Sequence, residues 1–184
     1  VVTFETKRDE PVTVRMATSF ISPEQAERNL AREIGEKDFD RIRREGHDVW
    51  NSHLSRFAVE DDEAGDAVRL RTFYSALYRM LLYPRELHEY DADGKLVHYS
   101  PFNGKVLPGR MYTDNGFWDT FRAVHPFFNL FYPEFSRNFL EGLANTYRES
   151  GWLPEWVSPG HVDCMVGSNS ASVVASAVIL NGVK

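Results

Sequence analysis

The stretch Asn115-Gly116-Phe117-Trp118-Asp119-Thr120-Phe121-Arg122-Ala123-Val124-His125-Pro126 combines a helix-start signal with an aromatic ring and an acid. Asn115, or the Asp before it, can cap a helix, and Gly116 permits a tight turn into that helix. We therefore expect Trp118 and Asp119 to lie at the mouth of a helix, where their side chains can face a cavity.

An indole ring beside a fixed carboxylate suits the binding of a sugar. The ring stacks against the C–H bonds of the sugar, and the carboxylate accepts hydrogen bonds from its hydroxyl groups. The alternative is structural: Trp118 is buried, and Asp119 caps the helix or pairs with Arg122. Taken by themselves, the residues favour the structural alternative.

The composition permits a hydrophobic core and argues against some partners. Hydrophobic residues make up 42% of the chain and aromatic residues 14%. A formal net charge of −6 argues against a nucleic-acid or anionic-membrane surface. The longest apolar run, residues 173–180, is far shorter than the ~20 residues of a membrane span. Because the chain begins with Val1, we expect that preceding residues were removed or left out.

The hydrophobic pattern predicts a short β segment followed mainly by helices. Residues 12–19 alternate apolar and polar side chains, and residues 1–6 are expected to form a second strand across a polar turn. Two strands are not stable alone, so further strands are expected upstream. Pro126 is expected to kink or split one helix after His125. The expected helices are residues 23–34, 38–54, 67–83, 117–131, 133–148 and 167–180.

Two segments lack helical periodicity. Residues 86–112 carry a turn, one candidate strand at 95–99 and several Pro and Gly residues, so a long irregular loop is expected. Loops of this length often lie at the rim of a functional site. The segment Gly151-Trp152-Leu153-Pro154-Glu155-Trp156 is expected to be rigid, and it suits a sugar subsite and a packed corner between helices equally.

Common motifs with a defined chemistry are missing from the sequence. It has no P-loop, no dinucleotide-binding Gly turn, no Cys/His metal cluster and no nucleophile elbow. From the residues alone, the candidate working carboxylates are Asp119, Glu155 and Asp163. The sequence does not give the distances between them, so it assigns them no roles.

Four segments of the chain, taken in order, resemble glycoside hydrolase family 92, the calcium-dependent exo-acting α-mannosidases. The most specific is Trp-Asp-Thr-Phe-Arg-Ala-Val-His-Pro at 118–126, with Tyr-Thr-Asp at 112–114 before it. The others are residues 11–30, the run Phe-Tyr-Ser-Ala-Leu-Tyr-Arg at 73–79, and the region 151–167 with Gly-Trp-Leu-Pro-Glu-Trp and Cys-Met-Val-Gly. The resemblance covers nearly the whole chain.

The resemblance implies a mainly α fold with an N-terminal β remnant, namely the end of a β-sandwich domain followed by the first helices of an (α/α)6 barrel. Residues 1–21 would be the last strands of the sandwich, residues 22–62 linking helices, and residues 63–184 the first part of the catalytic barrel. Such a barrel buries each helix against two neighbours. This part alone is therefore expected to leave a large apolar face in water.

The resemblance also implies an enzyme, an α-mannosidase that removes α-linked mannose from N-glycans or mannans with inversion. In an inverting site one carboxylic acid protonates the leaving oxygen, and a second carboxylate, about 6.5–9.5 Å away, activates water. Ca2+, a hard cation with oxygen ligands, is the implied cofactor. A secreted or periplasmic location is implied. The implied partners are a mannose-containing glycan and the remainder of the same polypeptide, with no nucleic acid and no membrane span.

Position by position, the resemblance makes Asp119 a ligand of the mannose hydroxyls at the cleavage point, with Trp118 beside it and Trp156 lining the same pocket. The family segments that hold the general acid, the general base and the calcium ligands match nothing in this chain. We therefore expect no catalytic residue and no metal ligand here, and no activity from this segment alone. Asn169 and Ser176 stand where the family often has His and Asp, which leaves the linkage preference open.

Two alternatives are left open. One is another (α/α)6 sugar-processing enzyme with a different linkage or ring preference, which a panel of substrates distinguishes. The other is a noncatalytic carbohydrate-binding or scaffold protein, in which the rest of the gene product carries no paired carboxylates.

Overall fold

The computed structural model describes residues 3–59 and 67–182, so the expected boundary between residues 62 and 63 lies outside it. The helices, in chain order, are α1 (Pro23–Asn29), α2 (Phe39–Leu54), α3 (Ala67–Met80), α4 (Phe117–Thr120), α5 (Val124–Phe131), α6 (Pro133–Ser150) and α7 (Asn169–Asn181), with a π-helical turn η1 (Leu30–Ile34) after α1. The strands are β1 (Arg85–Glu86), β2 (His88–Tyr90), β3 (Leu96–Tyr99), β4 (Val106–Pro108), β5 (Tyr112–Thr113), β6 (Asn115–Gly116) and β7 (Trp156–Val157).

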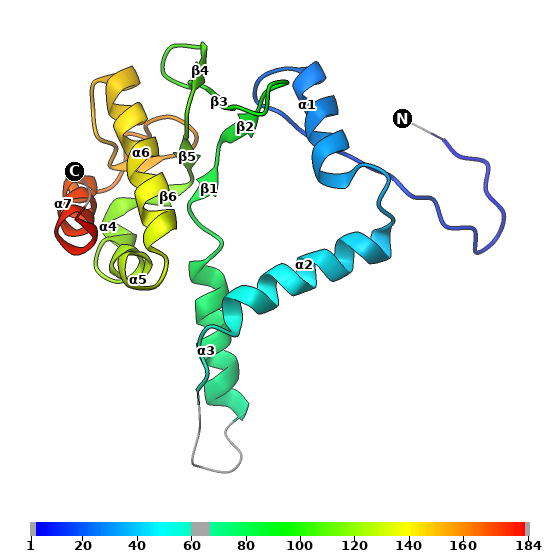
Figure 1. Ribbon diagram of the computed structural model, residues 1–184, viewed down its shortest axis with the longest axis horizontal. Helices are drawn as coiled ribbons and strands as arrows, with labels where there is room; N and C mark the ends of the chain where they lie inside the picture. The colour runs from blue at the N-terminus through cyan, green and yellow to red at the C-terminus, as the bar shows by residue number, and fades with distance from the viewer. Residues whose placement is uncertain (1–2, 60–66, 183–184) are drawn as a thin grey trace.

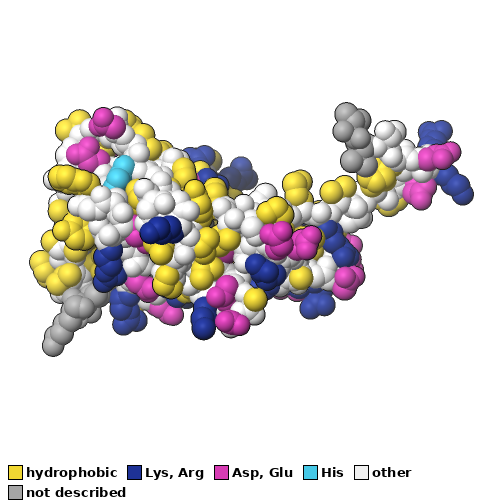
Figure 2. All heavy atoms as spheres, turned by 90° about the horizontal axis from the view of Figure 1, so that it is seen from above, with side chains coloured by type: hydrophobic (Ala, Val, Ile, Leu, Met, Phe, Trp, Pro, Cys, Tyr) yellow, Lys and Arg dark blue, Asp and Glu magenta, His cyan; other side chains and the backbone are white. Residues whose placement is uncertain are grey.

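Helices α4 to α7 gather at one end of the molecule (Figure 1). There α5 packs against α6 and α7, and α4 packs against α7. Helix α2 runs from this body toward α1, and the N-terminal segment projects beyond α1 as an extended arm (Figures 1 and 2). Within the described ranges, every helix is too short or too polar to span a bilayer.

The hydrophobic core lies where β5, α4, α6, β7 and α7 meet. Its buried members are Tyr112, Phe117, Phe139, Leu143, Val157 and Val173. Phe117 is completely buried, and burying one such side chain contributes roughly 1.5–3 kcal/mol. Gly142 lets α6 approach β5 closely, because a Cβ on this residue would lie 2.7 Å from Cδ2 of Tyr112.

Three small antiparallel sheets connect the helices: β1 with β5, β2 with β3 and β4, and β6 with β7. The three-stranded sheet occupies much of residues 86–112, so the prediction of a long irregular loop is wrong there, while the candidate strand at 95–99 is confirmed as β3. Strands β2 and β4 have only three residues each. A run this short shows too little alternation to be predicted, because period-2 patterns need about four to eight residues.

Buried polar contacts join the three-stranded sheet to α6. His98 of β3 is completely buried, and its Nδ1 lies 2.9 Å from the carbonyl oxygen of Gly109. Its Nε2 lies 2.9 Å from Oε1 of Glu149 in α6. In the same helix, Asn145 donates to the carbonyl oxygen of Arg110 at 3.0 Å. These contacts fix the sheet against the C-terminal half of α6, just before the loop that leads to β7.

Side-chain hydrogen bonds attach α1 and the segment before it to β2. Gln25 donates through Nε2 to the carbonyl oxygen of Tyr90 at 2.7 Å. The Glu89 carboxylate accepts from Nδ2 of Asn29 at 2.6 Å and from Oγ of Ser19 at 3.0 Å. A single carboxylate of β2 thus holds both α1 and the end of the N-terminal segment.

No strand forms among residues 3–21 of the described chain, so the predicted strands at 1–6 and 12–19 are wrong for these residues. The alternating apolar side chains are present but exposed, with Val14 at 69% and Met16 at 74%. A strand pair is stabilised by further strands or a helix packed on its apolar face, and within the described residues the apolar side chains Val14 and Met16 stay exposed. The assignment of residues 1–21 to a β-sandwich domain stays a prediction.

Most of the predicted helix boundaries are confirmed. Ser22 caps α1 by accepting from the backbone N–H of Gln25, and Asp38 caps α2 by accepting from that of Arg41. Gly151 ends α6 in the left-handed conformation, with φ 85°. These boundaries depend on contacts within a few residues of each helix end, so they can be predicted from the sequence.

The break that was expected at Pro126 occurs earlier in the chain. Helix α4 ends at Thr120 and α5 begins at Val124, with turn residues between them. Pro126 is therefore in the first turn of α5, where a missing backbone N–H removes no intrahelical hydrogen bond. The prediction that Pro126 splits a helix after His125 is wrong, because this proline fits the start of a new helix.

Candidate functional site

A corner between β6 and α4 carries the residues of the central motif. Strand β6 pairs antiparallel with β7, which places Gly116 directly opposite Trp156. The backbone N–H of Phe117 donates to the carbonyl oxygen of the residue before Trp156 at 3.2 Å, so the pairing continues into α4. The Phe117 ring enters the core, whereas Trp118 and Asp119, the next residues of α4, are exposed.

The start of α4 is capped differently from the prediction. Gly116 is the N-cap and makes no side-chain hydrogen bond, and Asn115 belongs to β6. The carboxylate of Asp114 is bonded elsewhere. The prediction that Asn115 or Asp114 caps this helix is therefore wrong, because Asn115 pairs within β6 and the Asp114 carboxylate accepts from Ser158 and Arg85.

Trp156 and Asp119 meet over Gly116. A Cβ built on Gly116 would lie 2.5 Å from Oδ2 of Asp119 and 2.6 Å from Cδ1 of Trp156, with Nε1 of that indole closer still. The carboxylate and the indole ring thus lie side by side above the glycine. Pairing of β6 with β7 brings these two residues together from distant parts of the sequence.

The side chains at this corner are open to solvent. Trp118 is 38% exposed, Asp119 is exposed, and Trp156 is half-buried. Among the residues that the structure describes, Asp119 forms no ion pair. Arg122, the alternative partner, lies with its guanidinium 4.7 Å from the ring centre of Phe121. The structural alternative, a buried Trp118 and an Asp119 paired with Arg122, is not adopted.

Asp114 ties β7 to β1. It adopts the left-handed backbone conformation with φ 57°, which Asp and Asn tolerate better than most residues. Its Oδ1 accepts from Oγ of Ser158 at 2.7 Å, and its Oδ2 accepts from Nε of Arg85 at 2.5 Å. We call this contact of Arg85, Asp114 and Ser158 the Asp114 latch. It holds the strand that carries Trp156 close to the strand that carries Gly116.

His125 lies beneath the corner and is almost completely buried. Its ring centre is 4.9 Å from that of Phe139, and its Nε2 lies 3.5 Å from Nδ2 of Asn115. Burial away from water lowers the pKa of His125 from 6.5 to about 4. The ring is therefore neutral at pH 7 and acts as a member of the aromatic core.

The other two candidate carboxylates, those of Glu155 and Asp163, are both exposed to solvent. Glu155 gives its backbone carbonyl to the corner while its side chain is exposed, and Asp163 is exposed in the loop before α7. Sequence reasoning did not find the Asp114 latch or the role of His125. The partners of Asp114 lie far along the chain, and the only local signal is the Asp-Asn-Gly turn sequence at 114–116.

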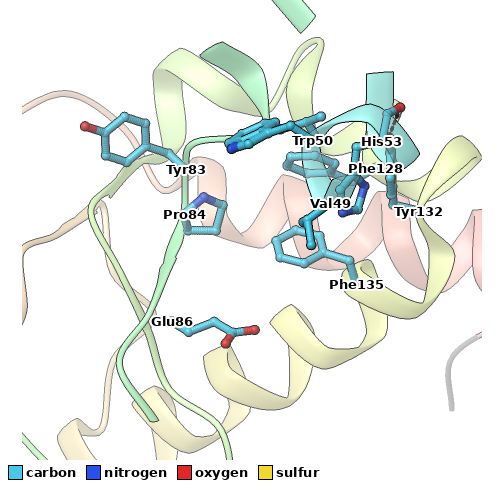
Figure 3. Close-up of a pocket in the computed structure, with 10 residues that line it drawn as sticks. Val49, Trp50, His53, Tyr83, Pro84, Glu86, Phe128, Tyr132 and Phe135 are labelled. Atoms are coloured by element: carbon cyan, nitrogen blue, oxygen red, sulfur yellow. Dashed lines mark hydrogen bonds between the residues drawn. The ribbon is translucent and has the colours of Figure 1, made fainter. Parts of the chain in front are cut away.

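A separate cavity of about 370 Å³ lies between α2, the start of β1 and helices α5 and α6 (Figure 3). Its wall is mainly aromatic, with one carboxylate, and includes Trp50, His53, Tyr83, Glu86, Phe128 and Phe135. None of the three predicted site residues lines it. The predicted site and this cavity are therefore different places on the molecule.

The described part of the chain does not fit a calcium site by itself. Residues 3–59 and 67–182 contain no group of three or more His, Cys, Asp or Glu side chains that can hold a metal ion. Calcium takes six to eight oxygen ligands, usually with several carboxylates among them.

The family model of the glycosyl hydrolase family 92 catalytic domain matches residues 25–184. This chain therefore belongs to glycosyl hydrolase family 92. The resemblance seen in the four sequence segments is confirmed.

Two solved structures of this family are similar to the chain. The inverting mannosidase BT2199 from Bacteroides thetaiotaomicron VPI-5482 is 50% identical with a TM-score of 0.83, over 90% of this chain and 22% of that chain. The glycosyl hydrolase ccman5 is 28% identical with a TM-score of 0.61, over 71% of this chain and 17% of that chain. No curated protein matches. The chain thus spans about a fifth of the length of the solved structures that it matches.

Proposed function

We propose that this chain supplies part of the sugar-binding wall of an α-mannosidase that hydrolyses its substrate with inversion. One observation carries the proposal: the unpaired Asp119 carboxylate and the Trp156 indole converge on an accessible corner. The 50% identity to an inverting mannosidase supports the reaction class. The substrate class we propose is α-linked mannose at the end of N-glycans or mannans.

Each side chain has a distinct role in this proposal. Asp119 accepts hydrogen bonds from sugar hydroxyls, which are stronger when the acceptor is charged. Trp118 and Trp156 offer aromatic faces to the C–H bonds of the ring. Asp119 binds and orients the mannosyl unit and transfers no proton. The acid and base of an inverting site, about 6.5–9.5 Å apart, belong in this proposal to the remainder of the polypeptide.

The architecture and location that we propose follow the family. The helices α3 to α7 form the first part of an (α/α)6 barrel, and residues 1–21 are the last strands of a preceding β-sandwich. Apolar side chains are exposed on the N-terminal arm and on α7, for example Met16 and Ile179. Their exposure supports the proposal that other parts of the protein pack against these two segments. We propose a secreted or periplasmic enzyme that acts on mannose-containing glycans.

Calcium is part of the proposal, with its ligands outside the described residues. Ca2+ prefers oxygen ligands, and sugar hydroxyls belong to this class of ligand. Removal of calcium from the full-length enzyme by a chelator is expected to abolish turnover of an aryl α-mannoside, and added Ca2+ is expected to restore it. Full turnover in the presence of excess chelator would remove calcium from the proposal.

The role of Asp119 is tested by Asp119→Ala in the full-length enzyme. A hydrogen bond to a charged group contributes about 1.5–3 kcal/mol, so kcat/KM for an aryl α-mannoside is expected to fall by about 10- to 150-fold. Steady-state kinetics measure this change. Thermal unfolding of the variant is expected to match that of the wild type, because the carboxylate is exposed and pairs with no cation of the described chain.

Asp93→Ala is the matched control, since Asp93 is an exposed acid on the turn between β2 and β3. It is expected to retain wild-type kinetics. Normal activity of the folded Asp119→Ala variant would remove Asp119 from the site. Activity on a different linkage or ring, but not on mannosides, would favour the other sugar-processing enzymes of this architecture, and sugar binding without any turnover would favour a noncatalytic protein.

A further inference from the structure

Gly116 has an ordinary backbone conformation. Its φ of −97° and ψ of 116° lie in the β region, which every L-residue adopts without strain. It is not among the glycines with positive φ. The backbone conformation therefore does not require glycine at this position, and another reason must account for the missing side chain.

The space that a side chain would occupy is filled by two other residues. The position of a Cβ on Gly116 lies 2.5 Å from Oδ2 of Asp119 and 2.6 Å from Cδ1 of Trp156, with the indole nitrogen also in collision. Real Cβ atoms essentially never approach other atoms within 3.0 Å. A methyl group at residue 116 would thus displace the carboxylate, the indole, or both.

The two polar atoms that converge there are a donor and an acceptor, and neither is bonded to another group of the described chain. The indole nitrogen of Trp156 is only a donor, and the carboxylate oxygen of Asp119 is only an acceptor when ionised. Within the described residues, neither side chain makes a hydrogen bond, and the indole nitrogen is not a buried unsatisfied atom. Nε1 of Trp156 and Oδ2 of Asp119 both lie within 2.5 Å of the position of a Cβ on Gly116. The nitrogen and the oxygen are therefore close enough for one small polar group to contact both.

We infer that Gly116 is a positioning residue of the sugar-binding site, whose lack of a side chain lets the Trp156 N–H and the Asp119 carboxylate reach the same sugar hydroxyl. A hydroxyl group is both a donor and an acceptor, so it can donate to Asp119 and accept from Trp156 at once. This inference rests on the proposed function and adds to it the residue that sets the spacing of the pair.

The surroundings limit how far either side chain can move. Trp156 belongs to β7, which is held by its pairing with β6 and by the buried Val157 next to it. Asp119 lies in α4, and the first residue of this helix, Phe117, is completely buried and anchors the helix in the core. A Cβ on Gly116 therefore changes the distance between the two polar atoms while the core beneath them stays packed.

The test is Gly116→Ala in the full-length enzyme with an aryl α-mannoside as the substrate. KM is expected to rise roughly tenfold or more, as for the loss of one hydrogen bond to a charged group, with kcat changed much less. The thermal midpoint is expected to stay close to that of the wild type. A wild-type KM, with or without a lower thermal midpoint, would overturn the inference.

Two other glycines provide matched controls. Gly142→Ala places a Cβ 2.7 Å from the Tyr112 ring in the core, so it is expected to lower the thermal midpoint without changing KM. Gly46→Ala places a Cβ in open space on α2, so it is expected to change neither. An increase in KM for Gly142→Ala as large as that for Gly116→Ala would show a general packing effect and would overturn the inference.

Trp156→Phe provides a second variant in case Gly116→Ala does not fold. It keeps an aromatic face and removes the N–H, so KM is expected to rise by a similar factor, and an unchanged KM overturns the inference. Failure of the inference is distinct from failure of the proposed function. If only Asp119→Ala loses activity, the site stands and the role of Gly116 falls; if Asp119→Ala is also fully active, the proposed site falls with it.

Discussion

His125 is packed against the rings of Phe117 and Phe139 and carries no charge at neutral pH. Its pKa of about 4 in the folded chain, against 6.5 ordinarily, means that the unfolded chain binds a proton between these values that the folded chain does not. The contribution of neutral His125 to the free energy of unfolding is therefore complete above pH 6.5, and it is lost as the pH falls toward 4. We expect the free energy of unfolding of the full-length protein to fall by up to about 3 kcal/mol across this range.

The variant His125→Phe isolates this contribution, because a phenyl ring keeps the stacking and cannot be protonated. Denaturant titrations across the same pH range are expected to give a flatter dependence for the variant than for the wild type. His47→Gln is the control, since His47 is exposed on α2. An identical pH dependence in His125→Phe and the wild type would contradict a buried neutral His125.

The residues of the candidate site differ in how far the sequence predicts them. Trp118 and Asp119 stand in one short motif, and a pattern along the chain is enough to pick them out. The convergence of Trp156 with Asp119 depends on the pairing of β6 with β7, which are distant in the sequence. It also depends on Gly116, where a Cβ would collide with both side chains in the folded chain. Periodicity reports local structure, so it could not give this spacing.

At the scale of elements, the Asp114 latch connects β1, the β5–β6 turn and the residue after β7. Asp114→Ala removes these contacts and leaves a residue with a Cβ at φ 57°. We expect a loss of about 1–3 kcal/mol in the free energy of unfolding. Hydrogen exchange at the β7 amides is expected to become faster in the full-length protein, since the latch holds this strand.

Asp114→Asn separates the two causes of that loss. Asn tolerates the left-handed conformation and can still accept from Ser158, so a smaller loss of stability is expected. The comparison uses the same denaturant titrations and exchange measurements. Equal losses for the two variants would contradict a contribution from the backbone conformation, and unchanged exchange in Asp114→Ala would contradict the latch itself.

Elements with local signals were predictable and elements made by tertiary pairing were not. Ser22, Asp38 and Gly151 mark helix ends through hydrogen bonds and backbone conformation within a few residues. The strands of two or three residues, such as β2 and β7, exist because a partner strand lies beside them. Pro126 shows the same limit: proline is permitted both at a break and in a first turn, and packing of α5 against α6 and α7 decides between them.

At the scale of the whole molecule, large apolar side chains lie on the outside of the helical end. Figure 2 shows hydrophobic side chains over this end of the molecule. On α7, Val178, Ile179 and Leu180 are 44%, 80% and 52% exposed. A helix that is apolar on all sides is typically buried in a larger core, which agrees with a chain that spans about a fifth of the matched structures.

We therefore expect a polypeptide limited to these 184 residues to bind a hydrophobic dye such as ANS and to show no turnover of an aryl α-mannoside. The full-length protein is expected to turn the substrate over and to bind little dye. Fluorescence titration and steady-state kinetics on both preparations measure the difference. Turnover by the short polypeptide would contradict the proposal that the acid and base lie elsewhere.

Ile179→Lys provides the control for that surface. In the short polypeptide the added charge is expected to reduce dye binding, whereas in the full-length protein it is expected to lower the thermal midpoint, because a charge is costly to bury. An unchanged thermal midpoint in the full-length variant would show that α7 remains in water there.

The buried contact of His98 with Gly109 and Glu149 gives the molecule a spectroscopic probe of its own assembly. Nδ1 faces the carbonyl oxygen of Gly109, and Nε2 faces the carboxyl group of Glu149. Docking of the three-stranded sheet on α6 thus places the imidazole between a backbone group and a side chain of the helix. The nuclear magnetic resonance signal of that imidazole becomes a built-in reporter of whether sheet and helix are joined.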